Sequence, residues 1–155
     1  MRHAISFRLN GEARTLDVEP WEVLLDVLRE RLGIKSPKVG CEMGECGACT
    51  VLLDGRTVRS CLVLAVEADG HEIVTVEGLG AEGLTALQSA FLKHHSFQCG
   101  FCAPGVVLSA AELLARNPHP SEWETRMALT GNLCRCTGYL PILDGIREAA
   151  EGGDQ

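Results

Sequence analysis

Eight cysteines, arranged in two sets of four, constrain the fold of this 155-residue chain more than any other feature. The first set has the spacing C-x4-C-x2-C, with a fourth cysteine after eleven further residues: Cys41, Cys46, Cys49 and Cys61. The second set is a C-x2-C pair and, after 31 residues, a C-x-C pair: Cys99, Cys102, Cys134 and Cys136. Four disulfides would suit a secreted chain, but the N-terminus has no apolar signal segment. Thiolate ligation of metal is therefore the better interpretation.

The first set has the ligand spacing of plant-type [2Fe–2S] ferredoxins. Backbone N–H groups stabilise such a cluster, and a tight loop can point them inward only where residues tolerate unusual dihedral angles. Gly40, Gly44 and Gly47 supply that tolerance. The Asp54-Gly55 turn predicts a hairpin that returns Cys61 to the loop. Zinc is the alternative metal, but structural zinc sites favour separated pairs of ligands.

The second set is ambiguous when it is considered alone. Each of its pairs lies at the end of a predicted helix, and a zinc site would explain the pattern almost as well as iron and sulfur. Beside the first set, a second [2Fe–2S] cluster is the better interpretation because all eight cysteines are then used, four and four. A Rieske centre is disfavoured, since no histidine stands at ligand spacing to a cysteine.

The chain changes character midway, from strand-forming to helix-forming sequence. Alternating apolar residues around the Asn10-Gly11 turn predict a hairpin over 4–18, and a helix over 21–32 ends at Gly33. A second hairpin over 50–61 and a strand over 71–76 complete a small α+β domain on a mixed sheet. After a glycine-rich linker over 77–83, helices are expected at 85–95, 105–116, 121–130 and 142–150. We therefore expect two domains, 1–77 and 84–155.

Composition excludes several classes of function. The net charge of −7, with 14 scattered basic residues, argues against binding nucleic acid or an anionic membrane surface. No stretch approaches the roughly 20 apolar residues that a membrane-spanning helix needs. We expect a cytoplasmic protein whose thiols stay reduced.

Four sequence stretches carry more specific information: Gly40-Cys41 with GECGACTV over 44–51, Ser60-Cys61, QCGFC over 98–102 and GNLCRCTGY over 131–139. In order and separation they resemble the iron–sulfur subunit, or the corresponding N-terminal region, of the molybdenum hydroxylases. This family includes xanthine dehydrogenase, aldehyde oxidoreductase, carbon monoxide dehydrogenase and 4-hydroxybenzoyl-CoA reductase. One departure is Ala103, where the family often has threonine. This departure puts one local hydrogen bond in doubt and leaves cluster binding unaffected.

The resemblance implies an α+β fold, in which a β-grasp domain like that of plant ferredoxins precedes a four-helix domain, each with one [2Fe–2S] cluster. It implies a non-catalytic subunit of a molybdenum-dependent oxidoreductase, with no catalytic residue of its own. Electrons would pass from a molybdopterin-binding large subunit to an FAD-binding medium subunit or another acceptor. By position, the second set would receive electrons and the first set would pass them on. Gln98 is a candidate contact of the pterin.

Two other functions are consistent with parts of the sequence. A freestanding two-cluster, ferredoxin-like electron carrier would need no partner subunits, but a shuttle requires only one cluster domain, and the helical half would then have no purpose. A zinc-stabilised interaction protein would be colourless.

Overall fold

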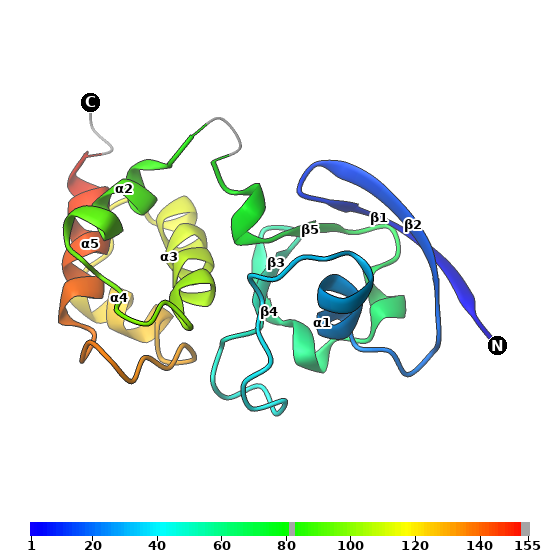
Figure 1. The fold of residues 1–155 in the computed structure, drawn as a ribbon. Helices are drawn as coiled ribbons and strands as arrows, with labels where there is room; N and C mark the ends of the chain where they lie inside the picture. Colours follow the sequence, from blue (N-terminus) through cyan, green and yellow to red (C-terminus); the bar gives the residue numbers. More distant parts are fainter. Residues whose placement is uncertain (81–82, 153–155) are drawn as a thin grey trace.

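A mixed five-stranded sheet forms the first half of the chain (Figure 1). The computed structural model describes residues 1–80 and 83–152. Its strands are β1 (His3–Leu9), β2 (Glu12–Val18), β3 (Thr50–Leu53), β4 (Arg56–Arg59) and β5 (Glu72–Val74). The order across the sheet is β2-β1-β5-β3-β4, and only β1 and β5 pair in parallel. The predicted mixed sheet is confirmed.

Both predicted hairpins form around two-residue turns. Asn10 and Gly11 have φ angles of 52° and 83°, and Asp54 and Gly55 have 48° and 78°. Two consecutive positive φ angles are the requirement of a type I′ turn, whose twist matches that of the flanking strands. The last strand is shorter than expected, because the N–H of Thr75 donates to the side chain of Asn10 instead of continuing the ladder.

The helix over the sheet differs from the one predicted over 21–32. An α-helical turn, α1 (Leu24–Asp26), begins only after Val23, which is extended and bridges to Leu64. It continues as a π-helix, η1 (Val27–Arg31), in which the N–H of Leu32 donates to the carbonyl five residues back. Its apolar side chains pack on the sheet in the first core, which contains Ile5, Phe7, Leu9, Val18, Leu24, Val27, Leu28, Val51 and Ile73.

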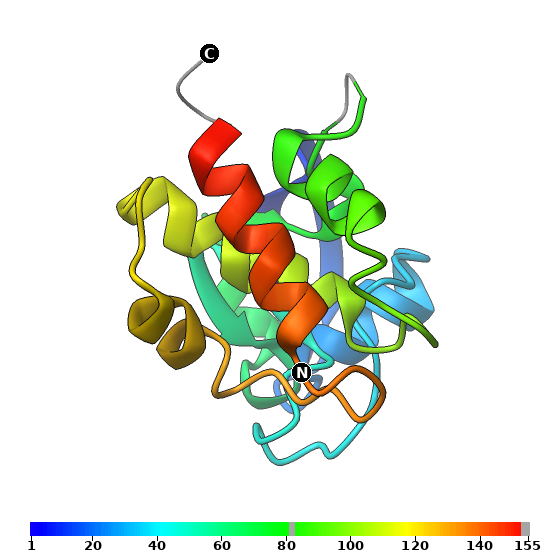
Figure 2. The same ribbon diagram turned by 90° about the vertical axis from the view of Figure 1, so that its left-hand side faces the viewer.

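Four helices follow, as predicted: α2 (Ala86–Lys93), α3 (Ala103–Arg116), α4 (Glu122–Ala128) and α5 (Leu140–Glu151) (Figure 2). Thr85 and Ser121 cap α2 and α4 in reciprocal capping boxes. Helices α3 and α5 begin two residues earlier than expected, since each carries a proline in its first turn, where no N–H is needed. Their apolar faces form a second core: Leu87, Phe91, Val106, Val107, Ala110, Leu129, Ile142, Leu143 and Ile146.

Helix α3 joins the two halves by packing against β3 and β4. The carboxylate of Glu112 accepts the N–H of Thr57 at 2.9 Å and pairs with Arg56 at 2.8 Å. It therefore supplies a hydrogen-bond acceptor to β4, which lies at the edge of the sheet. Two separate cores agree with two domains. The division into 1–77 and 84–155 stays a prediction, and residues 81–82 and 153–155 lie outside the described part.

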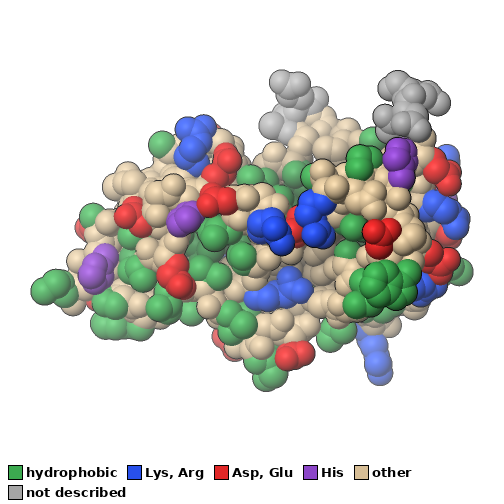
Figure 3. Space-filling model, turned by 180° about the vertical axis from the view of Figure 1, so that it is seen from behind, with side chains coloured by type: hydrophobic (Ala, Val, Ile, Leu, Met, Phe, Trp, Pro, Cys, Tyr) green, Lys and Arg blue, Asp and Glu red, His purple; other side chains and the backbone are tan. Residues whose placement is uncertain are grey.

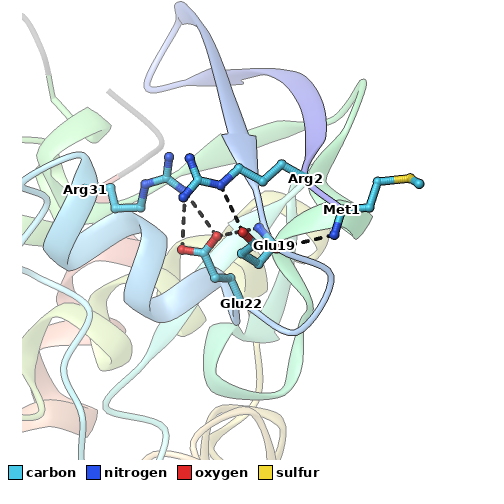
Figure 4. A network of polar contacts seen from close by, with 5 residues as sticks. All are labelled: Met1, Arg2, Glu19, Glu22 and Arg31. Carbon is cyan, nitrogen blue, oxygen red and sulfur yellow. Dashed lines mark hydrogen bonds and ion pairs between the residues drawn. The ribbon is translucent and has the colours of Figure 1, made fainter.

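Charged groups are spread over the surface in small clusters. Around the N-terminus, Arg2 pairs with Glu19 at 2.9 Å and Arg31 with Glu22 at 3.1 Å (Figure 4). Such exposed pairs contribute less than about 1 kcal/mol each. Acidic and basic side chains are also interspersed on the face drawn in Figure 3. Within the described residues, no helix is long and apolar enough to cross a membrane.

The close approach of the halves generates a prediction about Gly105, at the start of α3. A Cβ atom there would lie 2.3 Å from the carbonyl oxygen of Gly47, which belongs to the first cysteine loop. We expect Gly105→Ala to lower the free energy of unfolding by about 1–3 kcal/mol, because the backbones must separate. Thermal unfolding followed by circular dichroism measures this. Gly152→Ala, with open space around the added atom, is the control, and equal stability of both variants would contradict the prediction.

Candidate iron–sulfur sites

The segments that carry the cysteines gather on one side of the molecule. The first loop, over 40–49, and the loop over 130–139 lie near each other at the bottom of both Figure 1 and Figure 2. All eight cysteines are free thiols. The fold therefore brings both sets to one region, where the two halves of the chain meet.

In the first set, the return of the second hairpin positions the fourth cysteine, as predicted. Strand β4 ends at Arg59, and a short 3₁₀ turn, η2 (Ser60–Leu62), carries Cys61 to Cys49. Their sulfur atoms are 3.4 Å apart and buried beside Leu25. Ser60 fixes this arrangement, since both its N–H and its hydroxyl donate to the carbonyl of Cys49.

The other two thiols of the first set lie in a loop that turns its N–H groups toward sulfur. Cys41 Sγ accepts the N–H of Cys46 at 3.3 Å and that of Met43 at 3.5 Å. Gly44 and Gly47 have positive φ angles, as expected. Gly40 has another reason to be glycine: a Cβ atom there would lie 2.7 Å from Cys46 Sγ. The expectation of an unusual dihedral angle at Gly40 was therefore wrong.

In the second set, the two pairs come from different segments of the helical half. Cys99 and Cys102 precede α3, while Cys134 and Cys136 lie between α4 and α5. Cys99 Sγ and Cys136 Sγ are 3.6 Å apart. Cys102 and Cys134 are also neighbours, since each thiol acts on the pKa of the other. Each close pair therefore contains one cysteine from the C-x2-C segment and one from the C-x-C segment.

These distances distinguish a metal site from a disulfide. A disulfide would require about 2.05 Å, whereas a tetrahedral metal with sulfur bonds of about 2.3 Å holds two thiolates roughly 3.7 Å apart. The pairs at 3.4 and 3.6 Å match thiolates that share one metal. Among residues 1–80 and 83–152, no three His, Cys, Asp or Glu side chains converge as a single-ion site. Thiols that approach in pairs are the arrangement that a two-iron cluster needs, because its four thiolate ligands are divided between two irons.

The first set contains one acidic thiol and one that resists ionisation. N–H groups of Cys46 and Met43 lower the pKa of Cys41 to about 7, because they stabilise the thiolate. Burial, together with the neighbouring Cys49, raises the pKa of Cys61 to about 11. Metal must displace such protons, so binding at Cys61 is expected to release one.

The second set shows the same contrast. Burial and contact with Cys134 raise the pKa of Cys102 to about 12. Burial also acts to raise the pKa of Cys134, but hydrogen bonds from Thr137 and the N–H of Cys136 outweigh it, and the net shift is downward. The hydroxyl of Thr137 lies 3.2 Å from Cys134 Sγ.

The side chain of Tyr139 forms hydrogen bonds to the backbone of the loop that carries Cys134. Its hydroxyl accepts the N–H of Cys134 at 2.9 Å and donates to the carbonyl of Asn132 at 3.1 Å. The residue itself adopts a left-handed backbone conformation, with φ 71°, immediately before α5. One phenol therefore fixes the backbone on which Cys134 stands.

A direct hydrogen bond connects the two sets. The N–H of Leu133, next to Cys134, donates to the carbonyl of Cys46 at 2.9 Å. Beside it, the buried amide of Asn132 donates to Thr50 Oγ1 at 3.3 Å and accepts the hydroxyl of Ser109 at 2.8 Å. The sequence shows Asn132 and Tyr139 only as parts of the matching stretches. The partners of Asn132 lie 23 and 82 residues away, and those of Tyr139 lie five and seven residues away in an irregular loop that has no periodic pattern.

Gln98 is exposed, and its amide donates to the carbonyl of Cys136 at 3.2 Å. The residue is therefore at the edge of the second set, where a molecule docking there could meet it. Its predicted contact with a pterin, like the ligand role of each cysteine, stays a prediction.

The support by Tyr139 can be tested by removing its hydroxyl. We expect Tyr139→Phe to cost about 1–3 kcal/mol, because the N–H of Cys134 loses its acceptor. Thermal unfolding of the chain as purified measures the loss. Thr130→Val, which removes an exposed hydroxyl bonded to Met127, is the control. A Tyr139→Phe variant as stable as this control would contradict the support.

Comparison with known proteins agrees with this geometry. A family model described as a 2Fe-2S iron-sulfur cluster binding domain matches residues 7–75, and one described as a [2Fe-2S] binding domain matches 75–147. The small subunit of nicotine 6-hydroxylase from Paenarthrobacter nicotinovorans is 50% identical over 148 residues, which are 96% of this chain and 90% of that protein. The small FeS subunit of nicotinate dehydrogenase from Eubacterium barkeri is 49% identical, with 95% and 94% covered.

Solved structures agree as well. The crystal structure of quinoline 2-oxidoreductase from Pseudomonas putida 86 contains a chain that matches with a TM-score of 0.93 and 51% identity, over 97% of this chain and 95% of that one. The predicted α+β fold, the two [2Fe–2S]-binding regions and the resemblance are thereby confirmed. The chain belongs to the family of small iron–sulfur subunits of the molybdenum hydroxylases.

Proposed function

We propose that this chain is the electron-transfer subunit of a molybdenum-dependent dehydrogenase, with Cys41, Cys46, Cys49 and Cys61 holding one [2Fe–2S] cluster and the second set holding the other. When bound, such a cluster accepts and releases one electron at a time. The observation that carries the proposal is the pairing of thiols at 3.4 and 3.6 Å in two sets that one hydrogen bond connects.

The residues of the chain have distinct tasks in this function. The N–H groups around Cys41 and the hydroxyl of Thr137 stabilise negative charge on sulfur. Leu133 connects the sets, since its N–H reaches the carbonyl of Cys46 and its own carbonyl carbon continues into Cys134. Burial of Cys49 and Cys61 excludes water from one side of the first set.

Partner subunits follow from the family and from the surface. We propose a molybdopterin-binding large subunit next to the second set, where Gln98, Cys99 and Cys136 are exposed, and an FAD-binding medium subunit next to the first. Large apolar side chains lie exposed close to the cysteines: Met43, Leu62, Phe101, Leu133 and Leu140. Exposed apolar surface of this kind is typical of sites that another chain covers. Eight free thiols also favour a cytoplasmic location.

The proposal is tested by iron and acid-labile sulfide analysis of the anaerobically purified full chain, with low-temperature EPR after dithionite reduction. We expect about four irons and four sulfides for each chain, with two distinguishable signals, because each four-thiolate set holds one cluster. Copurification from the native cell is expected to bring molybdenum and FAD. Zinc without sulfide, or an intact native complex without molybdenum, would contradict the proposal.

A single substitution separates the sites. We expect Cys61→Ser to remove one of the two EPR signals and about half of the iron, because the first set then has three thiolates. Cys99→Ser is the matched variant for the second set and should remove the other signal. Both signals unchanged in Cys61→Ser would exclude Cys61 as a ligand.

A further inference from the structure

Lys38 precedes the first cysteine loop, yet its side chain reaches the second set. Its Nζ atom lies over the ring of Phe101, 5.5 Å from the ring centre. Phe101 stands between Cys99 and Cys102 in the sequence. A lysine ammonium over an aromatic face is held by cation–π attraction. A positive charge from the sheet half is therefore fixed beside two thiols of the helical half.

The backbone around Lys38 is held on both sides. Its N–H donates to the carbonyl of Ala48 at 2.8 Å, within the first cysteine loop. Arg29 Nη1 donates to the carbonyl of Pro37 at 2.7 Å, and Lys38 Nζ itself donates to the carbonyl of Ser36 at 3.2 Å. The ammonium is thus an ordered part of the junction between the halves, unlike the freely moving end of a surface lysine.

Groups of both signs act on this ammonium. Burial lowers the pKa of Lys38, and Arg29 lowers it further, while Glu77 and the thiols of Cys102 and Cys99 act in the opposite direction. The position of the Lys38 Nζ atom over the ring of Phe101 is the geometry of a cation–π contact. Glu77 is engaged by both the N–H and the hydroxyl of Ser36 and by Thr75. Its carboxylate is therefore shared among other donors.

We infer that Lys38 raises the reduction potential of the cluster held by Cys99, Cys102, Cys134 and Cys136, and thereby couples that potential to the docking of the two halves. The inference rests on the proposed function. Reduction by one electron adds one negative charge to the cluster, and a cation nearby lowers the energy of the reduced form. Partial burial at the junction strengthens this field, because water screens it less than at an open surface.

The test is a redox titration of the anaerobically purified full chain, with each cluster followed by its own EPR signal. The Cys61→Ser and Cys99→Ser variants identify which signal belongs to which set. Lys38→Met removes the charge and keeps the length of the side chain, whereas Lys38→Arg keeps the charge. Lys93→Met is the control, since it removes an exposed lysine that pairs with Glu148 at the end of α2.

At a fixed ambient potential, we expect the ratio of reduced to oxidised second cluster to fall about tenfold in Lys38→Met, which corresponds to about 59 mV for a one-electron couple. The first cluster should change less, and Lys38→Arg and Lys93→Met should match the unmodified chain. An unchanged ratio in Lys38→Met with both clusters present would overturn the inference and leave the proposed function intact.

Two further outcomes are decisive. If Lys38→Met loses the second cluster while Lys38→Arg keeps it, Lys38 serves assembly, and the role in setting the potential is refuted. If the unmodified chain itself contains no iron and sulfide, the proposed function fails, and the inference fails with it.

Discussion

The buried side chain of Asn132 is the contact on which the arrangement of the two halves depends. Its amide donates to Thr50 Oγ1 in the first strand of the second hairpin, and its oxygen accepts the hydroxyl of Ser109 from α3. Only 1% of the residue is exposed, so each of these bonds replaces one that water can no longer supply. With Asn132 held in this way, the next peptide N–H, of Leu133, is directed at the carbonyl of Cys46.

Glycines at the junction make this contact possible. Gly47 packs so closely on the other half that a Cβ atom would lie 2.2 Å from the carbonyl oxygen of Gly131. Arg59 fills the neighbouring space and donates to the same carbonyl and to Thr50. Glycines on one side and an arginine with several N–H donors on the other therefore bring two polar loops into contact. Arg59 Nε is the one buried side-chain polar atom in the described residues that lacks a partner.

How much the sequence could predict depended on the distance over which each feature acts. The Asn10-Gly11 and Asp54-Gly55 turns and the helices near 85–95 and 121–130 follow from local sequence, and each was predicted correctly. The π-helix η1 was not predicted. Whether a backbone N–H bonds the carbonyl five residues back or four residues back is decided here by packing on the sheet. The partners of Asn132 and Lys38 were also missed, since a pairing over about eighty residues, such as Asn132 with Thr50, leaves no local pattern.

The strand order has a consequence for how the chain is made. Strand β5 lies in the middle of the sheet although it is the last strand of the first half. The sheet therefore cannot close until residues 72–74 have left the ribosome, and by then all four cysteines of the first set have been synthesised. Domains made first generally fold first. The sheet half can thus fold before the loop that ends at Cys136 has been synthesised. That loop can then fold against the sheet half.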